Sequence, residues 1–219
     1  IMYYADKPKP RFRNLLSESI QHIKTNKLQS LYVFFLSCLG VTTTFQIYIY
    51  GPMQAHLSHN FSDQEIMISN ITSLIVLLCV FPLVGRLSDR VNREKIMITA
   101  SVGFLTLSQP FFYYLSNGNF HQLLLIQALI AIPAGAYYAT VPVMLAEMFP
   151  IKLRCTALSF LYSVAASLAA GLAPLLSMIL LRETQIATSP TLLVIILVII
   201  VLAIQLKYSK RMSAKLILR

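Results

Sequence analysis

Six long runs of apolar residues alternate with short polar segments along the chain. The runs lack the strict alternation of apolar and polar residues that a membrane barrel needs. Backbone groups in lipid must be paired within the segment, so each run predicts a helix. About 20 helical residues cross a hydrocarbon core of roughly 30 Å. The predicted spans are Leu31–Tyr50, Ile66–Val84, Ile96–Leu115, Leu123–Leu145, Ala157–Leu181 and Thr191–Leu206, of which the last is short unless it starts near Ile186.

Positive charges fall on alternate sides of these spans. The chain has 18 lysines and arginines. All but Arg182 lie before span 1, between spans 2 and 3, between spans 4 and 5, or after span 6. By the positive-inside rule this pattern predicts that both termini are cytoplasmic. Charge that served only solubility would not alternate through every loop.

The two ends of the chain differ from its middle. Residues 11–28 carry spaced apolar positions, which predicts a short amphipathic helix lying either in the membrane interface or against the bundle. The basic tail is expected to contact anionic lipid. We therefore expect a cytoplasmic linker with an amphipathic helix at 1–28, a six-helix transmembrane bundle at 29–206 and a basic cytoplasmic tail at 207–219. The chain opens with Ile1 and no signal-peptide pattern, so a fragment and an unusual start are both open.

Composition narrows the class of protein. The chain is 57% hydrophobic and 12% charged, about half the charged share of soluble domains. A net charge of +10 would suggest nucleic acid in a soluble protein, but these charges lie between apolar spans, so we expect a lipid bilayer and no nucleic acid as partner. Cys38, Cys79 and Cys155 show no metal-binding spacing. We expect no metal site and no cofactor.

Two charged clusters interrupt the apolar pattern, both on the predicted cytoplasmic side. The first is GRLSDRVNREK at 85–95, and the second is AEMFPIKLRCT at 146–156. Asp89 can accept hydrogen bonds at the N-terminus of a neighbouring helix, such as the start of span 5. Arg90 and Arg93 can bind carboxylates, which makes Glu147 a candidate partner for either. Such contacts would latch the cytoplasmic face in one state and release it in another.

The first cluster resembles the loop motif of the major facilitator superfamily, written G-x-x-x-D-R-x-G-R. Gly85, Asp89, Arg90 and Arg93 match it; Asn92 replaces a glycine, and Glu94 stands where a second basic residue is common. The segment LAEMFPIKLRCTALS is similar to the A-E-x-F-P-x-x-x-R-x-T pattern of the branch that takes up organic metabolites with protons, which includes proline/betaine, dicarboxylate and shikimate transporters. The motif and gating residues implied are Gly85, Asp89, Arg90, Arg93, Glu147, Pro150 and Arg154.

The resemblance covers nearly the whole chain and matches it to helices seven to twelve of the family. It implies an all-α membrane protein whose six transmembrane helices form one half of a major facilitator bundle. The implied function is secondary transport of a small organic solute such as proline or betaine, by proton symport with alternating access. A dicarboxylate or other organic-acid symporter and a truncated, inactive fragment are the alternatives. The implied partners are the solute, a proton and an N-terminal six-helix half, in the bacterial inner membrane.

Such transporters bind substrate near the bilayer midplane, so polar residues inside the spans are the candidates. Tyrosine rings can hold a quaternary ammonium group. The opposing interpretation is structural, because serine and threonine often bond a carbonyl of their own helix. The predicted substrate-binding residues are Thr43, Gln46, Tyr48, Asn70, Tyr137, Tyr138, Tyr162 and Ser163.

The middle of each span lacks Asp, Glu, Lys, Arg and His. Proton coupling needs a titratable group in the pathway, so that group would belong to the first half. Two rival classes remain open: a self-contained six-helix protein that pairs with a separate first half or with itself, and a membrane-embedded enzyme. The sequence has no HExxH, GxSxG or paired intramembrane carboxylates, so we expect no catalytic residues and no enzyme activity.

Overall fold

The computed structural model describes residues 12–217, with side chains described for residues 15–208. Apart from short connections, this part of the chain is helical and contains no strand. The elements in order are α1 (Phe12–Thr25), α2 (Lys27–Phe45), the π-helix η1 (Gln46–Tyr50), α3 (Gly51–Leu57), α4 (Asp63–Ser88), α5 (Arg93–Asn117), α6 (Phe120–Glu147), α7 (Arg154–Thr184) and α8 (Thr191–Ile217).

Six helical stretches of the described chain are long and apolar enough to cross a membrane. They contain the six predicted spans, which are thereby confirmed. The last span does not begin near Ile186; it begins at Thr191, and its helix gains length by continuing to Ile217. Pro190 has no N–H to offer a preceding helix turn, so it suits a position just before the new helix. The stretches are Lys27–Leu57, Asp63–Ser88, Arg93–Asn117, Phe120–Glu147, Arg154–Thr184 and Thr191–Tyr208.

The first stretch combines three elements, because η1 joins α2 to α3 without a break. Pro52 cannot donate a backbone hydrogen bond, so the regular ladder fails one turn before it. The N–H of Gly51 instead donates to the carbonyl of Gln46, five residues back. Single π-helical turns of this kind occur often at functional sites.

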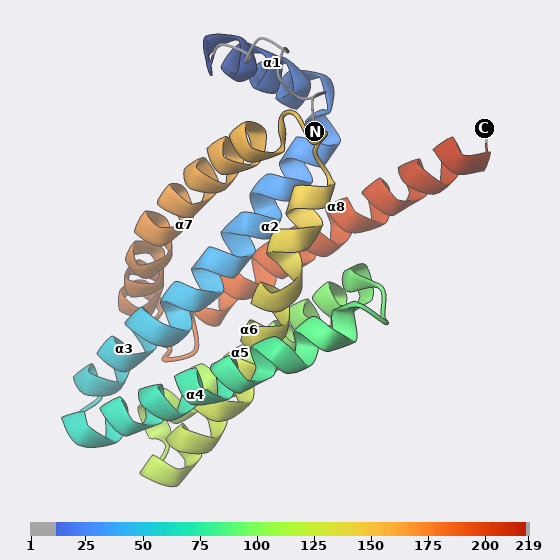
Figure 1. The fold of residues 1–219 in the computed structure, drawn as a ribbon. Coiled ribbons are helices and arrows are strands. Elements are labelled where there is room, and N and C mark those ends of the chain that lie inside the picture. The colour runs from blue at the N-terminus through green and yellow to red at the C-terminus, as the bar shows by residue number, and fades with distance from the viewer. Residues whose placement is uncertain (1–11, 218–219) are drawn as a thin grey trace.

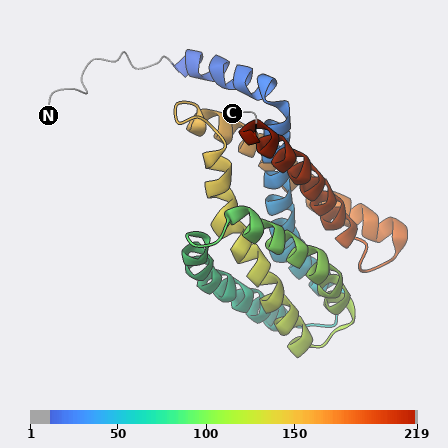
Figure 2. The same ribbon diagram turned by 90° about the vertical axis from the view of Figure 1, so that its right-hand side faces the viewer.

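The helices pack in two groups (Figure 1, Figure 2), with one large buried cluster and a smaller one between α2 and α7. Helix α6 packs between α4 and α5, while α2 packs against α7 and α8, and α5 contacts α8. Glycines bring α6 close to its neighbours: a Cβ on Gly135 would lie 2.8 Å from Val80 of α4, and one on Gly103 of α5 would lie 2.8 Å from Pro133. The largest fully buried side chains are aromatic and come mainly from α2, η1, α5 and α6: Tyr32, Tyr50, Phe104, Phe111, Phe112 and Tyr137.

One end of the bundle, which we call the basic end, is formed by connections 89–92 and 148–153 and by α1. Helix α1 lies across this end (Figure 1). Lys152 Nζ lies 2.7 Å from Glu18 Oε2, and the rings of His22 and Phe149 are 5.9 Å apart. Helix α1 therefore contacts the bundle at this end, and its position in the membrane interface stays a prediction. The division at residues 28 and 206 stays a prediction, since α8 runs through the second boundary.

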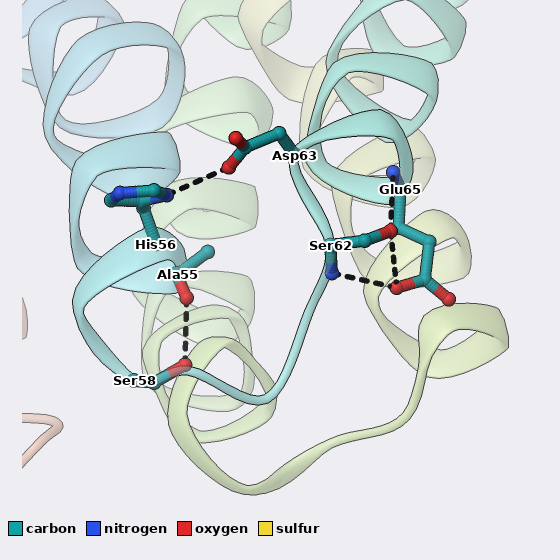
Figure 3. Close-up of polar contacts among 6 residues, drawn as sticks. All are labelled: Ala55, His56, Ser58, Ser62, Asp63 and Glu65. Atoms are coloured by element: carbon teal, nitrogen blue, oxygen red, sulfur yellow. Dashed lines mark hydrogen bonds and ion pairs between the residues drawn. The ribbon is translucent and has the colours of Figure 1, made fainter.

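The opposite end is formed by connections 58–62, 118–119 and 185–190. Figure 3 shows how the first of these starts α4. Ser62 Oγ accepts from the Glu65 N–H at 3.3 Å, and Glu65 Oε2 accepts from the Ser62 N–H at 2.9 Å. This reciprocal capping satisfies two backbone donors that the first helical turn leaves free. His56 Nδ1 lies 2.8 Å from Asp63 Oδ1, in an exposed pair that joins α3 to α4.

Candidate functional site

A cleft of about 300 Å³ lies between α2, α6 and α7. Three of the predicted substrate-binding tyrosines line it, and all of its lining residues are uncharged. Its volume is at the lower limit of ordinary ligand pockets, which suits a small solute. The lining residues are Leu36, Ser37, Gly40, Val41, Tyr137, Tyr138, Val141, Pro142, Leu145, Leu158, Ser159 and Tyr162.

Two of these tyrosines also connect α6 to α2. Tyr137 donates its hydroxyl to the carbonyl of Leu36 at 2.6 Å, and Tyr138 donates to that of Gly40 at 2.6 Å. The Tyr138 oxygen also lies 2.5 Å from Thr44 Oγ1. Gly40 permits the approach, because a Cβ there would lie 2.9 Å from the ring of Tyr137. Both hydroxyls are therefore committed to the scaffold; the Tyr137 ring is buried, while the half-buried Tyr138 ring keeps surface toward the cleft.

Tyr162 reaches the cleft from α7 and differs from the other two. It is 42% exposed, and its hydroxyl has no hydrogen-bond partner among the residues with described side chains. Pro142 lies in the wall opposite and cannot donate to the carbonyl of Tyr138 four residues earlier. The cleft thus offers a free phenol, a carbonyl without its helical donor and the hydroxyl of Ser159, while the Ser37 hydroxyl donates to the carbonyl of Val33.

The other predicted substrate-binding residues do not line this cleft. Thr43 donates to the carbonyls of Leu39 and Gly40 in its own helix, at 2.9 Å each. Gln46 is buried and donates to Ser177 Oγ and to the carbonyl of Pro190, at 3.2 Å each. Three more stand apart from it: Tyr48 and Asn70, which are half-buried with side-chain oxygens lacking a partner, and Ser163, which is exposed.

Sequence reasoning did not select Ser37, Pro142 or Ser159 for the site. Ser37 precedes Gly40 and Val41 by three and four residues, so all three share a helix face. The sequence shows that spacing. It does not show that this face of α2 is the one that meets α6 and α7.

The charged clusters meet at the basic end. The Arg93 guanidinium donates to Glu147 Oε1, which is one of the two pairings that the sequence raised for Glu147. The other partner considered, Arg90, is exposed, and so is Asp89, whose carboxylate has no partner within the described residues. Asp89 therefore does not contact the start of α7 in this conformation. The role of the cluster as a gate stays a prediction.

The remaining motif positions shape the ends of helices. Asn92, which stands in place of the motif glycine, accepts from the Glu94 N–H at 2.9 Å and caps α5. A Cβ on Gly85 would meet nothing within 4 Å, so packing does not require glycine there in this conformation. Pro150 follows the end of α6, and its carbonyl accepts at 2.9 Å from the N–H groups of Leu153 and Arg154.

A hydrogen-bond chain at the basic end was not predicted. Gln205 of α8 donates to Glu94 of α5 and accepts from the Tyr32 hydroxyl of α2. Tyr208 stacks on Tyr32 at a ring separation of 5.5 Å. Glu94, the acidic residue at a commonly basic motif position, thus joins three helices.

Comparison with known proteins agrees with this architecture. The family model of the Major Facilitator Superfamily matches residues 8–215. The proline/betaine transporter of Salmonella typhimurium is 30% identical over 201 residues, covering 86% of this chain and 38% of the relative. The ectoine/proline transporter ProP of Corynebacterium glutamicum is 33% identical over 119 residues, which cover 54% of this chain and 24% of the relative.

The citrate-proton symporter of Klebsiella pneumoniae is 28% identical over 162 residues, covering 69% of this chain and 35% of the relative. Each of these matches spans less than half the length of the relative. No solved structure gives a significant match. Six membrane-length helices and a family match over nearly the whole chain make this an integral membrane protein. The chain belongs to the Major Facilitator Superfamily.

Proposed function

We propose that this chain forms the second six-helix half of a secondary transporter for a small organic solute such as proline or betaine, taken up with a proton by alternating access. The partners in this proposal are the solute, the proton and a first six-helix half. Relatives named as proline, betaine and ectoine transporters support the solute class. The proposed location is the bacterial inner membrane.

The observation that carries the proposal is an uncharged cleft lined by Tyr137, Tyr138 and Tyr162. A quaternary ammonium group has no N–H to donate, so aromatic faces are the groups that hold it well. The carboxylate of the same solute can accept from the hydroxyls of Ser159 and Tyr162, whereas the Ser37 hydroxyl donates to the carbonyl of Val33 at 2.8 Å. The uncharged lining of the cleft suits a zwitterion, because the net charge of a zwitterion is zero.

Proton coupling then needs a titratable residue outside this lining. The cleft contributes neither a carboxylate nor a histidine, and we propose that the first half supplies the group. The pair Arg93–Glu147 is proposed as part of the gate at the basic end, because it joins the first residue of α5 to the last residue of α6.

An organic acid is the second candidate substrate. The citrate-proton symporter relative supports it, and so does Arg154, whose buried Nε has no partner among the described side chains. A guanidinium with a free donor suits a carboxylate. Arg154 begins α7 at the basic end and is not part of the cleft lining.

Uptake by the full-length protein in liposomes tests the first candidate. Tyr162→Leu should raise the KM for labelled betaine roughly 2- to 30-fold, which corresponds to the loss of about 0.5–2 kcal/mol of cation–π attraction. Tyr162→Phe keeps the ring and loses only the hydroxyl's hydrogen bond to the carboxylate, so it should raise the KM less than Tyr162→Leu. Tyr113→Leu changes an exposed tyrosine outside the cleft lining and serves as the control. Equal effects of Tyr162→Leu on betaine and citrate would overturn the aromatic argument.

We further propose that the basic end and both termini face the cytoplasm, on the distribution of positive charge. Exposed Cys155 at the start of α7 gives a native probe, while Cys38 is buried. In a Cys79→Ser background, a membrane-impermeant maleimide should label Cys155 only after cells are permeabilised. Asn117→Cys in a Cys155→Ser background marks the opposite end and should be labelled in intact cells. The reverse pattern would overturn the orientation.

A further inference from the structure

Prolines interrupt the interior of four membrane-length helices. Each lacks an N–H and so leaves the carbonyl four residues earlier without its helical donor. The interior prolines of these helices are Pro82, Pro110, Pro133, Pro142 and Pro174. Among them, Pro142 lines the cleft between α2, α6 and α7, and so does Tyr138, whose carbonyl it leaves without a donor.

The freed carbonyl of Tyr138 belongs to the wall of the cleft. Residues four apart in an α-helix lie on one face, and the carbonyl of the first points along the helix toward the second. Tyr138 is half-buried and Pro142 is exposed, so this stretch of α6 is open, whereas Tyr137 beside it is buried. The carbonyl therefore points along the face of α6 that borders the cleft.

The side chains of residues 15–208 do not supply the missing donor. The hydroxyl of Thr140, two residues further along α6, donates to the carbonyls of Ala136 and Tyr137. The hydroxyl of Tyr138 itself bonds α2. An unpaired carbonyl is costly in a membrane span and is tolerated where it lines a cavity that receives water or a ligand.

We propose that Pro142 determines which solutes the cleft prefers: because it has no N–H, the Tyr138 carbonyl is free to accept an N–H from the cationic amine of the solute. This inference rests on the proposed function and names the contact that separates two of its solutes. The cationic nitrogen of proline carries two N–H groups, whereas that of betaine carries three methyl groups and no N–H. Only proline can donate to the carbonyl.

The two solutes then use different parts of one cleft. The trimethylammonium group of betaine lies against the ring of Tyr162, a contact that needs no hydrogen bond. The N–H of proline bonds the Tyr138 carbonyl, and the positive charge on the donor strengthens that bond. The carboxylate, which both solutes share, accepts from the hydroxyls of Ser159 and Tyr162.

The side chains that line the cleft do not offer an equivalent acceptor. They include no carboxylate and no amide. The hydroxyls of Ser37, Tyr137 and Tyr138 already donate to carbonyls of α2. A backbone carbonyl is neutral, so it separates solutes with an N–H from solutes without one and leaves the cleft uncharged.

Uptake by the full-length protein in liposomes tests this contact. Pro142→Ala restores an N–H four residues after Tyr138, so that α6 bonds its own carbonyl. Alanine is the best helix former, and the variant should therefore keep α6. The KM for labelled proline should rise about tenfold, because a hydrogen bond to a charged group is lost, while the KM for betaine should change by less than about twofold.

A methylated series separates the N–H from the rest of the solute. Proline, N-methylproline and N,N-dimethylproline share one ring and one carboxylate, and their cationic nitrogens carry two, one and no N–H groups. Each is measured as a competitor of betaine uptake. Pro142→Ala should weaken inhibition by proline and leave inhibition by N,N-dimethylproline unchanged, with N-methylproline between them.

Two further variants control for changes in helix shape. Pro142→Val restores the same N–H with a different side-chain volume and should reproduce the solute dependence of Pro142→Ala. A different dependence would overturn the proposal, because side-chain volume would then set the preference. Pro110→Ala restores an N–H in α5, outside the cleft lining, and should leave both KM values near wild type.

The inference and the proposed function fail in different ways. If the wild-type protein takes up neither proline nor betaine, the proposed function is overturned and the inference with it. The inference alone is overturned if both solutes are taken up but Pro142→Ala leaves proline unchanged, or weakens proline and N,N-dimethylproline by the same factor. An equal loss would show that the proline shapes α6 and does not free an acceptor for the solute.

Discussion

The two ends of the bundle are held by different kinds of side chain. At the basic end two contacts between segments are ion pairs, Arg93 with Glu147 and Lys152 with Glu18, whose side chains are 30–59% exposed. The Gln29 amide also donates to the carbonyl of Met148 there. At the opposite end the exposed pair His56–Asp63 joins α3 to α4, but the buried contacts are amides that bond backbone carbonyls, as from Gln54 Nε2 to Ala187 at 3.0 Å. Gln54 is only 3% exposed.

This difference matters because the two kinds of contact fail differently. An exposed ion pair contributes little free energy, is screened by salt and can be separated into water. A buried amide that bonds a loop carbonyl leaves that carbonyl unpaired when it moves away. The comparison predicts that the segments at the basic end come apart easily, because their ion pairs can separate into water. At the opposite end, α3 and the connection 185–190 should move together, because the Gln54 amide bonds Ala187.

The largest effect should come from the opposite end. Gln54→Leu removes the donor to Ala187 and to Ser116 Oγ and should lower the free energy of unfolding by about 1–2 kcal/mol. The loss is moderated because the unpaired Gln54 Oε1 is removed as well. Thermal unfolding in detergent measures it. Gln64→Leu, at an exposed position in α4, is the matched control, and equal shifts in both variants would break the comparison.

The intermediate effect should come from Glu94, where the basic end uses a partly buried charge. Glu94→Leu leaves the Gln205 amide without its acceptor and should cost about 1 kcal/mol. Glu94→Gln keeps an acceptor and should cost less than half of that. If the glutamine variant is as unstable as the leucine variant, the charge itself holds α5 to α8, and the hydrogen bond does not.

Much of the fold was predictable, because a membrane span is a continuous run of apolar residues and can be recognised without knowing its neighbours. Ile66–Val84 and Leu123–Leu145 are apolar over membrane length whatever lies beside them, and the structure contains both spans. The basic residues after Leu206 predict a tail, but α8 continues through them to Ile217, because nothing there breaks a helix. The π-helical turn was not predicted, since Pro52 indicates a disturbed ladder but not which residues absorb it.

The site was less predictable because it depends on which helix faces meet. Tyr137, Tyr138 and Tyr162 come from two helices, and all three line one cleft. Gln46 had the same polar character in the sequence but bonds Ser177 and Pro190 elsewhere. The chain of Tyr32, Gln205 and Glu94 joins residues up to 173 positions apart, a separation that leaves no local pattern.

The smallest effect on stability should come from the pair Arg93–Glu147. Because these side chains are 30% and 55% exposed, a double-mutant cycle with Arg93→Ala and Glu147→Ala should give a coupling of about 0.2–1 kcal/mol, reduced in high salt. Transport should be more sensitive than stability if the pair belongs to the gate. Lys152→Ala, which removes the neighbouring pair with Glu18, is the control and should leave uptake near wild type. A large, salt-independent coupling with unchanged uptake would make the pair a structural tie, and the two ends would then no longer differ in how they open.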